Sequence, residues 1–196
     1  MGLPPPLPQT RKRTYLLFVG LGVALSIAAI LASRSFVRSF SIPTAGMAPA
    51  IEKGDVIIAE RFSYLRRSLQ RGDILVFRAG GVDLPVTMRA GDFYVKRLVG
   101  LPGETLAIVD GALLVNGVRT PIWNHAGEIR YHNLSSSRYL TNEHATMKVP
   151  AGQYFVLGDN SLRNMDSRFF GCIPAKSVFG RAVWRCAPAN RTGPID

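Results

Sequence analysis

Residues 93–104 read Phe-Tyr-Val-Lys-Arg-Leu-Val-Gly-Leu-Pro-Gly-Glu, with a lysine in the middle of an otherwise apolar run. The aromatic and β-branched residues favour a pleated, half-buried strand. Because side chains alternate along a strand, Lys96 and Arg97 project from opposite faces, so we expect one of these two cations to point inward. Burial disfavours the ammonium and lowers its pKa, and a fall of about 2 pH units would leave much neutral amine to act as a base. The alternative is an ordinary strand whose Lys96 reaches the solvent.

Short strand-like runs, separated by glycine and proline, extend on both sides of this segment. We expect strands at 36–42, 56–59, 74–77, 112–115, 153–157 and 178–184, and loops at 64–71 and 80–85. Asp110-Gly111 and Asn116-Gly117 are typical of tight hairpin turns. Residues 119–148 are polar and irregular, which indicates a variable insertion or a long hairpin. Because helical periodicity is nearly absent here, we predict a mostly β domain over residues 36–190.

The segment before this domain has a different character. Residues 15–32 form an uncharged run of 18 residues, which as a helix would span roughly 27 Å, close to the hydrocarbon thickness of a bilayer. We therefore predict one transmembrane anchor, with residues 1–14 as a proline-rich, basic cytoplasmic tail. A cleaved signal peptide is the alternative, but Ile30 and Ala32 make a poor small-x-small cleavage site.

The basic cluster Arg11-Lys12-Arg13 precedes the apolar run and, by the positive-inside rule, favours a cytoplasmic N-terminus. The β domain is then expected on the outer, periplasmic face of the cell membrane, as part of a single-pass protein. The net charge of +11 could indicate nucleic acid, but the sequence has no stacking motif, recognition helix or zinc spacing, so nucleic acid is not expected. A basic surface facing the anionic lipid of the phospholipid bilayer explains the charge better.

The sequence offers little for a metal or a disulfide. His125, His132 and His144 have no cysteine or carboxylate cluster around them that would complete a ligand set, so we expect no metal site. Cys172 and Cys186 could pair across a short loop in an oxidising compartment, or both could be free, buried thiols.

Three further blocks accompany the lysine strand. Residues 42–51 read Ile-Pro-Thr-Ala-Gly-Met-Ala-Pro-Ala-Ile, residues 71–77 read Arg-Gly-Asp-Ile-Leu-Val-Phe, and residues 158–171 read Gly-Asp-Asn-Ser-Leu-Arg-Asn-Met-Asp-Ser-Arg-Phe-Phe-Gly. In order and spacing, the four blocks together with the preceding apolar run resemble the bacterial type I signal peptidases. The resemblance covers most of the chain from that run to about Pro174, except for the insertion.

This resemblance implies a signal-peptidase-like β-fold tethered to the membrane, with a Ser–Lys dyad and no cofactor. Its activity would be that of a serine endopeptidase, which removes signal peptides from secretory preproteins after small-x-small sites. By resemblance, Lys96 is the general base and Thr44 assists the oxyanion. Asp166 and Arg168 would form a structural ion pair. Together with these two, the residues that shape the site would be Met47, Pro49, Asp159, Asn164 and Ser167. No oligomeric state is indicated.

The chain departs from the family pattern at the nucleophile. Gly46 stands where the family has its catalytic serine, and Asn164 stands where many members have a serine near the lysine amine. Loss of a nucleophile typically lowers kcat by a factor on the order of 10⁶. Thr44 or another group could substitute, a water activated by Lys96 could attack, or the change to glycine could be engineered or erroneous. Otherwise the protein is an inactive pseudopeptidase that binds preproteins or membrane partners.

Overall fold

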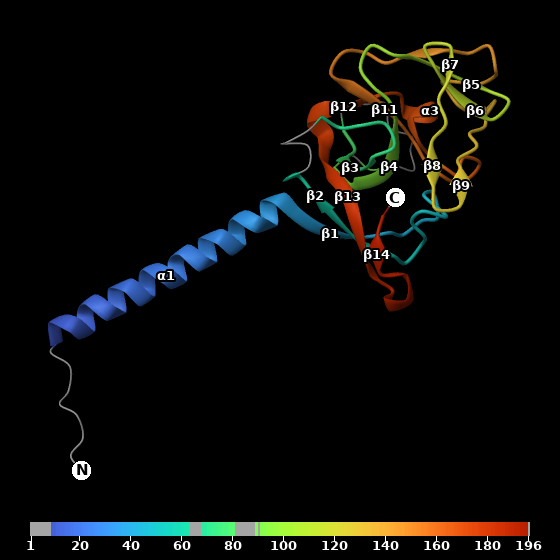
Figure 1. Cartoon of the computed structure of the whole chain (residues 1–196). Coiled ribbons are helices and arrows are strands. Elements are labelled where there is room, and N and C mark those ends of the chain that lie inside the picture. The colour runs from blue at the N-terminus through green and yellow to red at the C-terminus, as the bar shows by residue number, and fades with distance from the viewer. Residues whose placement is uncertain (1–8, 63–67, 81–88, 90, 196) are drawn as a thin grey trace. The chain divides into compact units, whose positions relative to one another are not determined.

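The computed structural model describes residues 9–62, 68–80, 89 and 91–195 (Figure 1). The predicted loops at 64–71 and 80–85 and the proline-rich start of the tail fall largely outside the described residues. The chain divides into two compact units, Met1–Val37 and Arg38–Asp196. We refer to the second unit as the globular unit.

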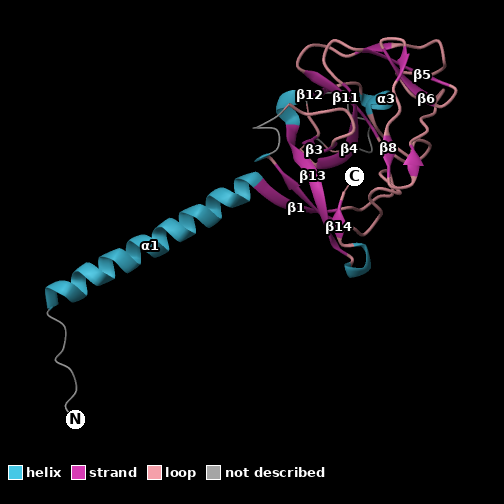
Figure 2. Cartoon of the chain, viewed as in Figure 1, coloured by secondary structure: helices cyan, strands magenta, loops and turns pink. Residues whose placement is uncertain are grey.

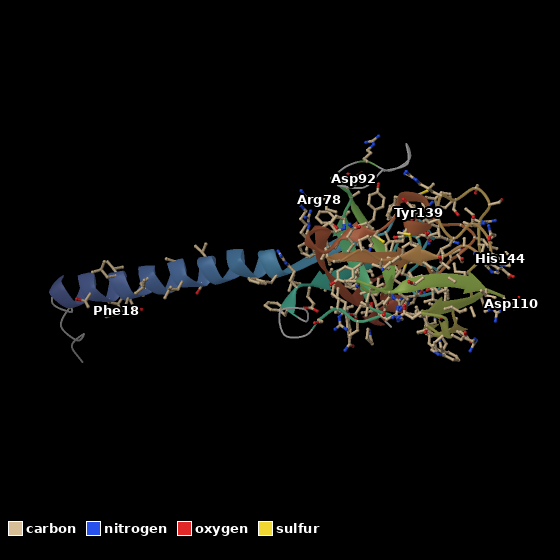
Figure 3. All side chains as sticks on the ribbon, turned by 90° about the horizontal axis from the view of Figure 1, so that it is seen from above. Phe18, Arg78, Asp92, Asp110, Tyr139 and His144 are labelled. Atoms are coloured by element: carbon tan, nitrogen blue, oxygen red, sulfur yellow. The ribbon has the colours of Figure 1, made fainter. Side chains whose placement is uncertain are left out.

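Helix α1 spans Gln9–Phe36, 28 residues, and extends beyond the predicted apolar run at both ends. At 1.5 Å per residue its length is about 42 Å. Its side chains are described for residues 14–27, and most of these are exposed and apolar, such as Phe18 (Figure 3). Within the described part of the chain, no helix is long and apolar enough to cross a membrane. The transmembrane helix at residues 15–32 therefore stays a prediction.

Strands dominate the globular unit, which confirms the mostly β prediction (Figure 2). Its main sheet has eight strands among the described residues, with β14 (Gly193–Pro194) pairing to β13. The order of the other strands is β1 (Val37–Ser41), β2 (Val56–Glu60), β13 (Val178–Ala187), β3 (Ile74–Arg78), β4 (Phe93–Gly100), β11 (Gln153–Leu157) and β12 (Ile173–Pro174). Each predicted strand of this sheet is present. However, β13 runs three residues past its predicted end, and β14 rather than β13 is the last strand.

A smaller sheet lies at the other end of the globular unit from β14 (Figure 1). Its strand order is β10 (Met147–Lys148), β5 (Thr105–Val109), β6 (Ala112–Val115) and β7 (Val118–Arg119), and a separate hairpin pairs β8 (Trp123–Asn124) with β9 (Gly127–Glu128). Asp110 and Gly111 have φ values of 50° and 76°, and Asn116 and Gly117 have 51° and 81°. Two consecutive positive φ angles are typical of type I′ turns, so both predicted hairpin turns are confirmed.

Apolar clusters cover both faces of the main sheet around β4. Val95 packs with the cluster that contains Ile57 and Val76, whereas Leu98 packs with the cluster that contains Leu75 and Phe77. As a result both basic residues of β4 are buried, with exposed fractions of 7% for Lys96 and 1% for Arg97. One of the two was expected to point inward, and the structure buries both. That expectation assumed that one face of the sheet is exposed to solvent, whereas apolar side chains cover both faces around β4.

Helical segments in the globular unit are short. Those that lie wholly within the described residues are α3 (Ser167–Phe170), η1 (Ala175–Ser177) and η2 (Ala189–Arg191). Both cysteines are free, and Cys172 is buried while Cys186 is exposed. Of the two alternatives, the unpaired one therefore holds, although only one of the thiols is buried.

Candidate active site

Lys96 lies in the middle of β4, opposite Leu75 of β3. Its Nζ donates a hydrogen bond to the carbonyl oxygen of Val95 at 3.1 Å. Burial lowers the pKa of Lys96 from 10.5 to about 8, because desolvation of the ammonium outweighs the attraction of the Asp166 and Asp159 carboxylates. With this pKa about a tenth of the amine is neutral at pH 7. The side chain can therefore accept a proton near neutral pH.

The two carboxylates near Lys96 are each paired to an arginine. Arg97 donates to Asp159 from Nε at 2.8 Å and from Nη2 at 2.7 Å. Arg168 donates to Asp166 in the same way, at 2.9 Å and 2.7 Å. These forked pairs are buried, and bidentate geometry makes them strong. Because each carboxylate faces its own guanidinium, neither is available as an ion-pair partner that would hold Lys96 charged.

The segment after β11 is fixed by the N-terminus of α3. Asp166 is the N-cap residue, and its Oδ1 accepts the backbone N–H of Arg168 at 3.1 Å. Its Oδ2 accepts the N–H of Gly158 at 3.2 Å. The hydroxyl of Ser167 accepts the N–H of Val156 at 3.0 Å. The bond to Arg168 caps α3, and the bonds to Gly158 and Val156 tie the start of α3 to the end of β11. Residues 158–168 are therefore held close to the sheet.

The irregular segment at 119–148 supports both ion pairs. Arg168 Nη1 donates to the carbonyl oxygen of His132 at 2.6 Å. Asn124 Nδ2 donates to Asp159 Oδ2 at 3.2 Å. Among the described residues, the histidines of this segment belong to no group that could hold a metal ion. The segment therefore contributes polar support to the site.

Gly46 lies in a turn that we call the active-site turn, residues 44–51. The turn follows β1 and is closed by hydrogen bonds from Ala48 N to Ala45 O at 3.1 Å and from Ile51 N to Met47 O at 2.9 Å. The carbonyl oxygen of Gly46 accepts the backbone N–H of Asn160 at 3.2 Å. It also accepts a hydrogen bond from Nδ2 of Asn164. The loop after β11 thus holds the active-site turn from one side.

Two arginines near the C-terminus hold the turn from the other side. Arg185 Nη1 donates to the carbonyl oxygen of Ala50 at 2.9 Å. Arg191 Nη2 donates to the carbonyl oxygen of Pro49 at 3.4 Å, and its Nη1 lies 3.3 Å from Asp55 Oδ1. Neither arginine has a local sequence signal, because each lies more than 100 residues from the turn it contacts.

The amide of Asn164 lies between two glycines. A Cβ placed on Gly46 would lie 3.1 Å from Asn164 Oδ1 and 3.2 Å from Nδ2. A Cβ placed on Gly158 would lie 1.2 Å from Asn164 Nδ2 and 2.6 Å from the carbonyl oxygen of Gly46. The first contact is tight, and the second is impossible without movement. Asn164 therefore fills space into which a side chain at position 46 would project.

Two pockets bring the predicted residues together. A pocket of about 120 Å³ is lined by Lys96, Thr44 and the apolar side chains of Phe40, Ile42, Met47, Phe93 and Val95. A more open pocket of about 420 Å³ is lined by Thr44, Gly46, Lys96 and Asn164, together with Tyr94, Arg163 and Met165. Residue 46 and the amine of Lys96 therefore face the same space, and the residue at 46 has no hydroxyl.

Residues 14–187 of this chain match the family model described as signal peptidase, peptidase S26. The chain belongs to this signal peptidase family. The signal peptidase I of Leptolyngbya laminosa is 36% identical over 88% of this chain and 80% of that protein. The signal peptidase I V of Bacillus subtilis (strain 168) is 32% identical over 81% of this chain and 91% of that protein. The predicted resemblance to signal peptidases is thus confirmed.

A solved signal peptidase I from Enterococcus faecalis V583 is 33% identical and covers 58% of this chain and 95% of that chain, with a TM-score of 0.42. Family membership rests on the sequence matches rather than on this superposition.

Some residues of the candidate site were not predicted from the sequence. Arg97 was placed on the lysine strand, but its partner Asp159 lies 62 residues away. Gly158 was quoted only as the first residue of a motif block, whereas its missing Cβ makes room for Asn164. The position of Arg97 next to Lys96 was a usable signal, because two neighbouring residues of a strand are both buried when the sheet is covered on both faces.

Proposed function

We propose that this chain is a membrane-anchored signal peptidase I, an endopeptidase of a serine peptidase family. It would remove signal peptides from secretory preproteins after small-x-small sites. The observation that carries the proposal is Lys96, a buried amine with a pKa lowered to about 8 that lines the same pocket as Thr44. A lysine that is neutral near physiological pH can do the work of a general base without histidine. The relatives named signal peptidase I support the same activity.

In the proposed reaction, neutral Lys96 takes a proton from a hydroxyl group while the oxygen attacks the scissile carbonyl carbon. Since Gly46 has no hydroxyl, the attacking oxygen belongs to Thr44 or to a water molecule in the same pocket. The ammonium of Lys96 then gives its proton to the leaving amine as the peptide bond breaks. With Thr44 the acyl group is transferred to the side-chain oxygen, and a water molecule then hydrolyses the ester and regenerates the hydroxyl. With water the peptide is hydrolysed directly.

Substrate binding in this proposal uses an edge of the main sheet. β1 is the terminal strand of the described sheet order, and its continuation through Ile42 and Thr44 lines the pocket of Lys96. An extended preprotein segment can add to such an edge by backbone hydrogen bonds. The pocket of about 120 Å³ is well below the ~300–1,000 Å³ of pockets for drug-sized ligands. Its apolar walls suit a small apolar side chain before the cleaved bond.

A second candidate function is that of a pseudopeptidase, which binds preproteins or membrane partners without cleaving them. Two observations favour it. Gly46 provides no nucleophile, and the Asn164 amide fills the space beside it. In this candidate the buried Lys96 and the two ion pairs persist as parts of a binding site.

One experiment separates the two candidates. Membranes that contain the native protein, Lys96→Ala, Thr44→Val or Gly46→Ser would be incubated with a preprotein, and the mature product measured. Cleavage by the native protein that is lost in Lys96→Ala supports the peptidase and contradicts the pseudopeptidase. Loss of cleavage in Thr44→Val assigns the attack to threonine, and retention assigns it to water.

The double variant Gly46→Ser/Asn164→Ser completes this experiment. A serine at position 46 meets the Asn164 amide, so the smaller residue at 164 is expected to give higher activity than Gly46→Ser alone. Activity in these serine variants but not in the native protein would contradict the peptidase proposal while supporting the location of the site.

The proposal includes a single-pass anchor at residues 15–32, with the N-terminus in the cytoplasm and the globular unit on the outer, periplasmic face. The uncharged apolar run and the preceding basic cluster support it. Alkaline carbonate should leave the protein in the membrane pellet, and protease added outside spheroplasts should digest the globular unit. Full protection from that protease would contradict the topology.

A further inference from the structure

A basic pocket shares one lining residue, Phe93, with the pocket of Lys96. Its volume is about 530 Å³, and three cationic side chains line it: Arg61, Arg78 and Lys176. All three are exposed. No carboxylate is present among the described residues that line this pocket. The size is within the range of small-molecule pockets, and the charge favours an anionic ligand.

Aromatic rings fix the orientation of two of these cations. The guanidinium of Arg78 lies over the ring of Phe93, with 5.0 Å between Cζ and the ring centroid. The guanidinium of Arg61 lies over the ring of Phe179 at 5.9 Å. Stacking on a ring leaves the N–H edge of a guanidinium directed sideways, which is the edge that binds phosphate oxygens. The pocket therefore combines oriented donors with positive charge, as phosphate recognition requires.

The rest of the lining is apolar. Phe93, Phe179, Pro174 and Val178 also line the pocket, and they are less exposed than its three cations. A free inorganic anion has no apolar atoms that could contact these side chains, whereas a phospholipid carries glycerol and acyl carbons next to its phosphate. Cations at a rim above apolar side chains are the usual arrangement of a protein surface that meets anionic lipid.

Chain connectivity keeps this pocket close to the end of α1. Arg38, two residues after that helix ends, stacks on the same Phe93 ring at 5.0 Å. Arg38 is only two residues from the end of the helix along the chain, and the ring that it contacts lines the pocket. With α1 anchored in a bilayer, the headgroup layer is therefore the nearest source of phosphate.

We propose that this pocket binds the phosphate headgroup of an anionic phospholipid. The lipid would set the height of the globular unit above the bilayer, and it would contact Phe93, which also lines the pocket of Lys96. The inference rests on the proposed membrane anchoring, but not on whether the protein cleaves preproteins.

The test is a titration of the full chain in dodecyl maltoside micelles with three ligands. These are dihexanoyl phosphatidylglycerol, dihexanoyl phosphatidylcholine and inorganic phosphate, and binding is measured by calorimetry. Phosphatidylglycerol is expected to bind most tightly. In Arg78→Gln/Lys176→Gln its Kd should rise at least about tenfold.

The matched control is Arg138→Gln/Lys148→Gln, which also removes one ring-stacked arginine and one exposed lysine. Arg138 neighbours Tyr139, and Lys148 belongs to the small sheet. In Figure 3 Arg78 lies at one end of the globular unit, and His144 and Asp110 lie at the other. The control should change the Kd by less than about twofold. Both double variants lose two positive charges and are measured in the same micelles. Comparing them therefore removes the effects of net charge and of lipid partition into the micelles.

Equal affinity for phosphate and phosphatidylglycerol would overturn the lipid assignment, and so would equal losses in the two double variants. Should Arg78→Gln/Lys176→Gln fail to fold, Lys176→Glu alone provides the test, with the same expected direction. Because no preprotein is present, a failure of the proposed peptidase activity leaves this result unchanged. Carbonate extraction reports separately on the anchor.

Discussion

Replacement of Lys96 by methionine tests the buried amine without any proteolysis. The folded state lowers the pKa of Lys96 from 10.5 to about 8. Between these two pH values the unfolded chain binds more protons than the folded chain, so the free energy of unfolding rises with pH across this window. Below pH 8 the folded state bears the whole cost of burying the ammonium, which is about 3 kcal/mol at 1.36 kcal/mol for each pH unit.

Methionine has a similar length and no charge to desolvate. At pH 7 we therefore expect Lys96→Met to be more stable than the native protein by about 3 kcal/mol. The difference should shrink as the pH rises above 8 and should vanish near pH 10.5, where both states of the native chain release the proton. Urea unfolding of the full chain in a non-ionic detergent measures this, with the fluorescence of Trp123 and Trp184 as the signal.

The control is Lys148→Met, because Lys148 is an exposed lysine on β10. Its stability relative to the native protein should not change between about pH 7 and about pH 11. Two results would refute the reasoning. If Lys96→Met is less stable than the native protein at pH 7, or if its difference does not depend on pH, the amine is solvated and charged. Lys96 would then have no special capacity as a base.

Three further substitutions test the supports of the site. Gly158→Ala should lower the free energy of unfolding, measured with urea, by about 1–3 kcal/mol because its Cβ overlaps the Asn164 amide. Adding Asn164→Ser should restore only part of the lost stability, since the carbonyl oxygen of Gly46 also lies too close to that Cβ. Arg168→Met should cost about 3–5 kcal/mol by leaving the buried Asp166 unpaired, and the double variant with Asp166→Asn should cost less; equal costs would contradict a coupled pair. Arg191→Ala should change global stability by at most about 1 kcal/mol yet speed hydrogen exchange in the active-site turn, and unchanged exchange would show that this arginine does not hold the turn.

The local parts of the fold were predictable from the sequence. Asp110-Gly111 and Asn116-Gly117 need positive φ angles that few other residue pairs adopt cheaply, so they fix two hairpins by themselves. The alternation in residues 93–100 likewise identifies β4. The burial of both Lys96 and Arg97 was not predictable in this way, because it depends on clusters that residues far along the chain assemble on each face of the sheet.

The candidate site likewise has parts that local sequence predicts and parts that depend on distant residues. The motif blocks pointed to Lys96, to position 46 and to the pairing of Asp166 with Arg168, because each block is contiguous in sequence. The packing of Asn164 between two glycines depends on a loop that returns to the active-site turn 118 residues later. No periodicity or propensity encodes such a contact, since it follows from the three-dimensional course of β11 and the loop after it.

The arginines from the end of the chain have a consequence for the order of synthesis. Arg191 contacts Pro49 across 142 residues, and at typical rates of synthesis the two residues are made roughly ten seconds or more apart. Until Arg191 is made, a nascent chain that already contains Lys96 and the loop of residues 158–168 still has one side of its active-site turn unsupported. We therefore expect the site to take its final geometry only after Arg191 has been added and can reach the turn.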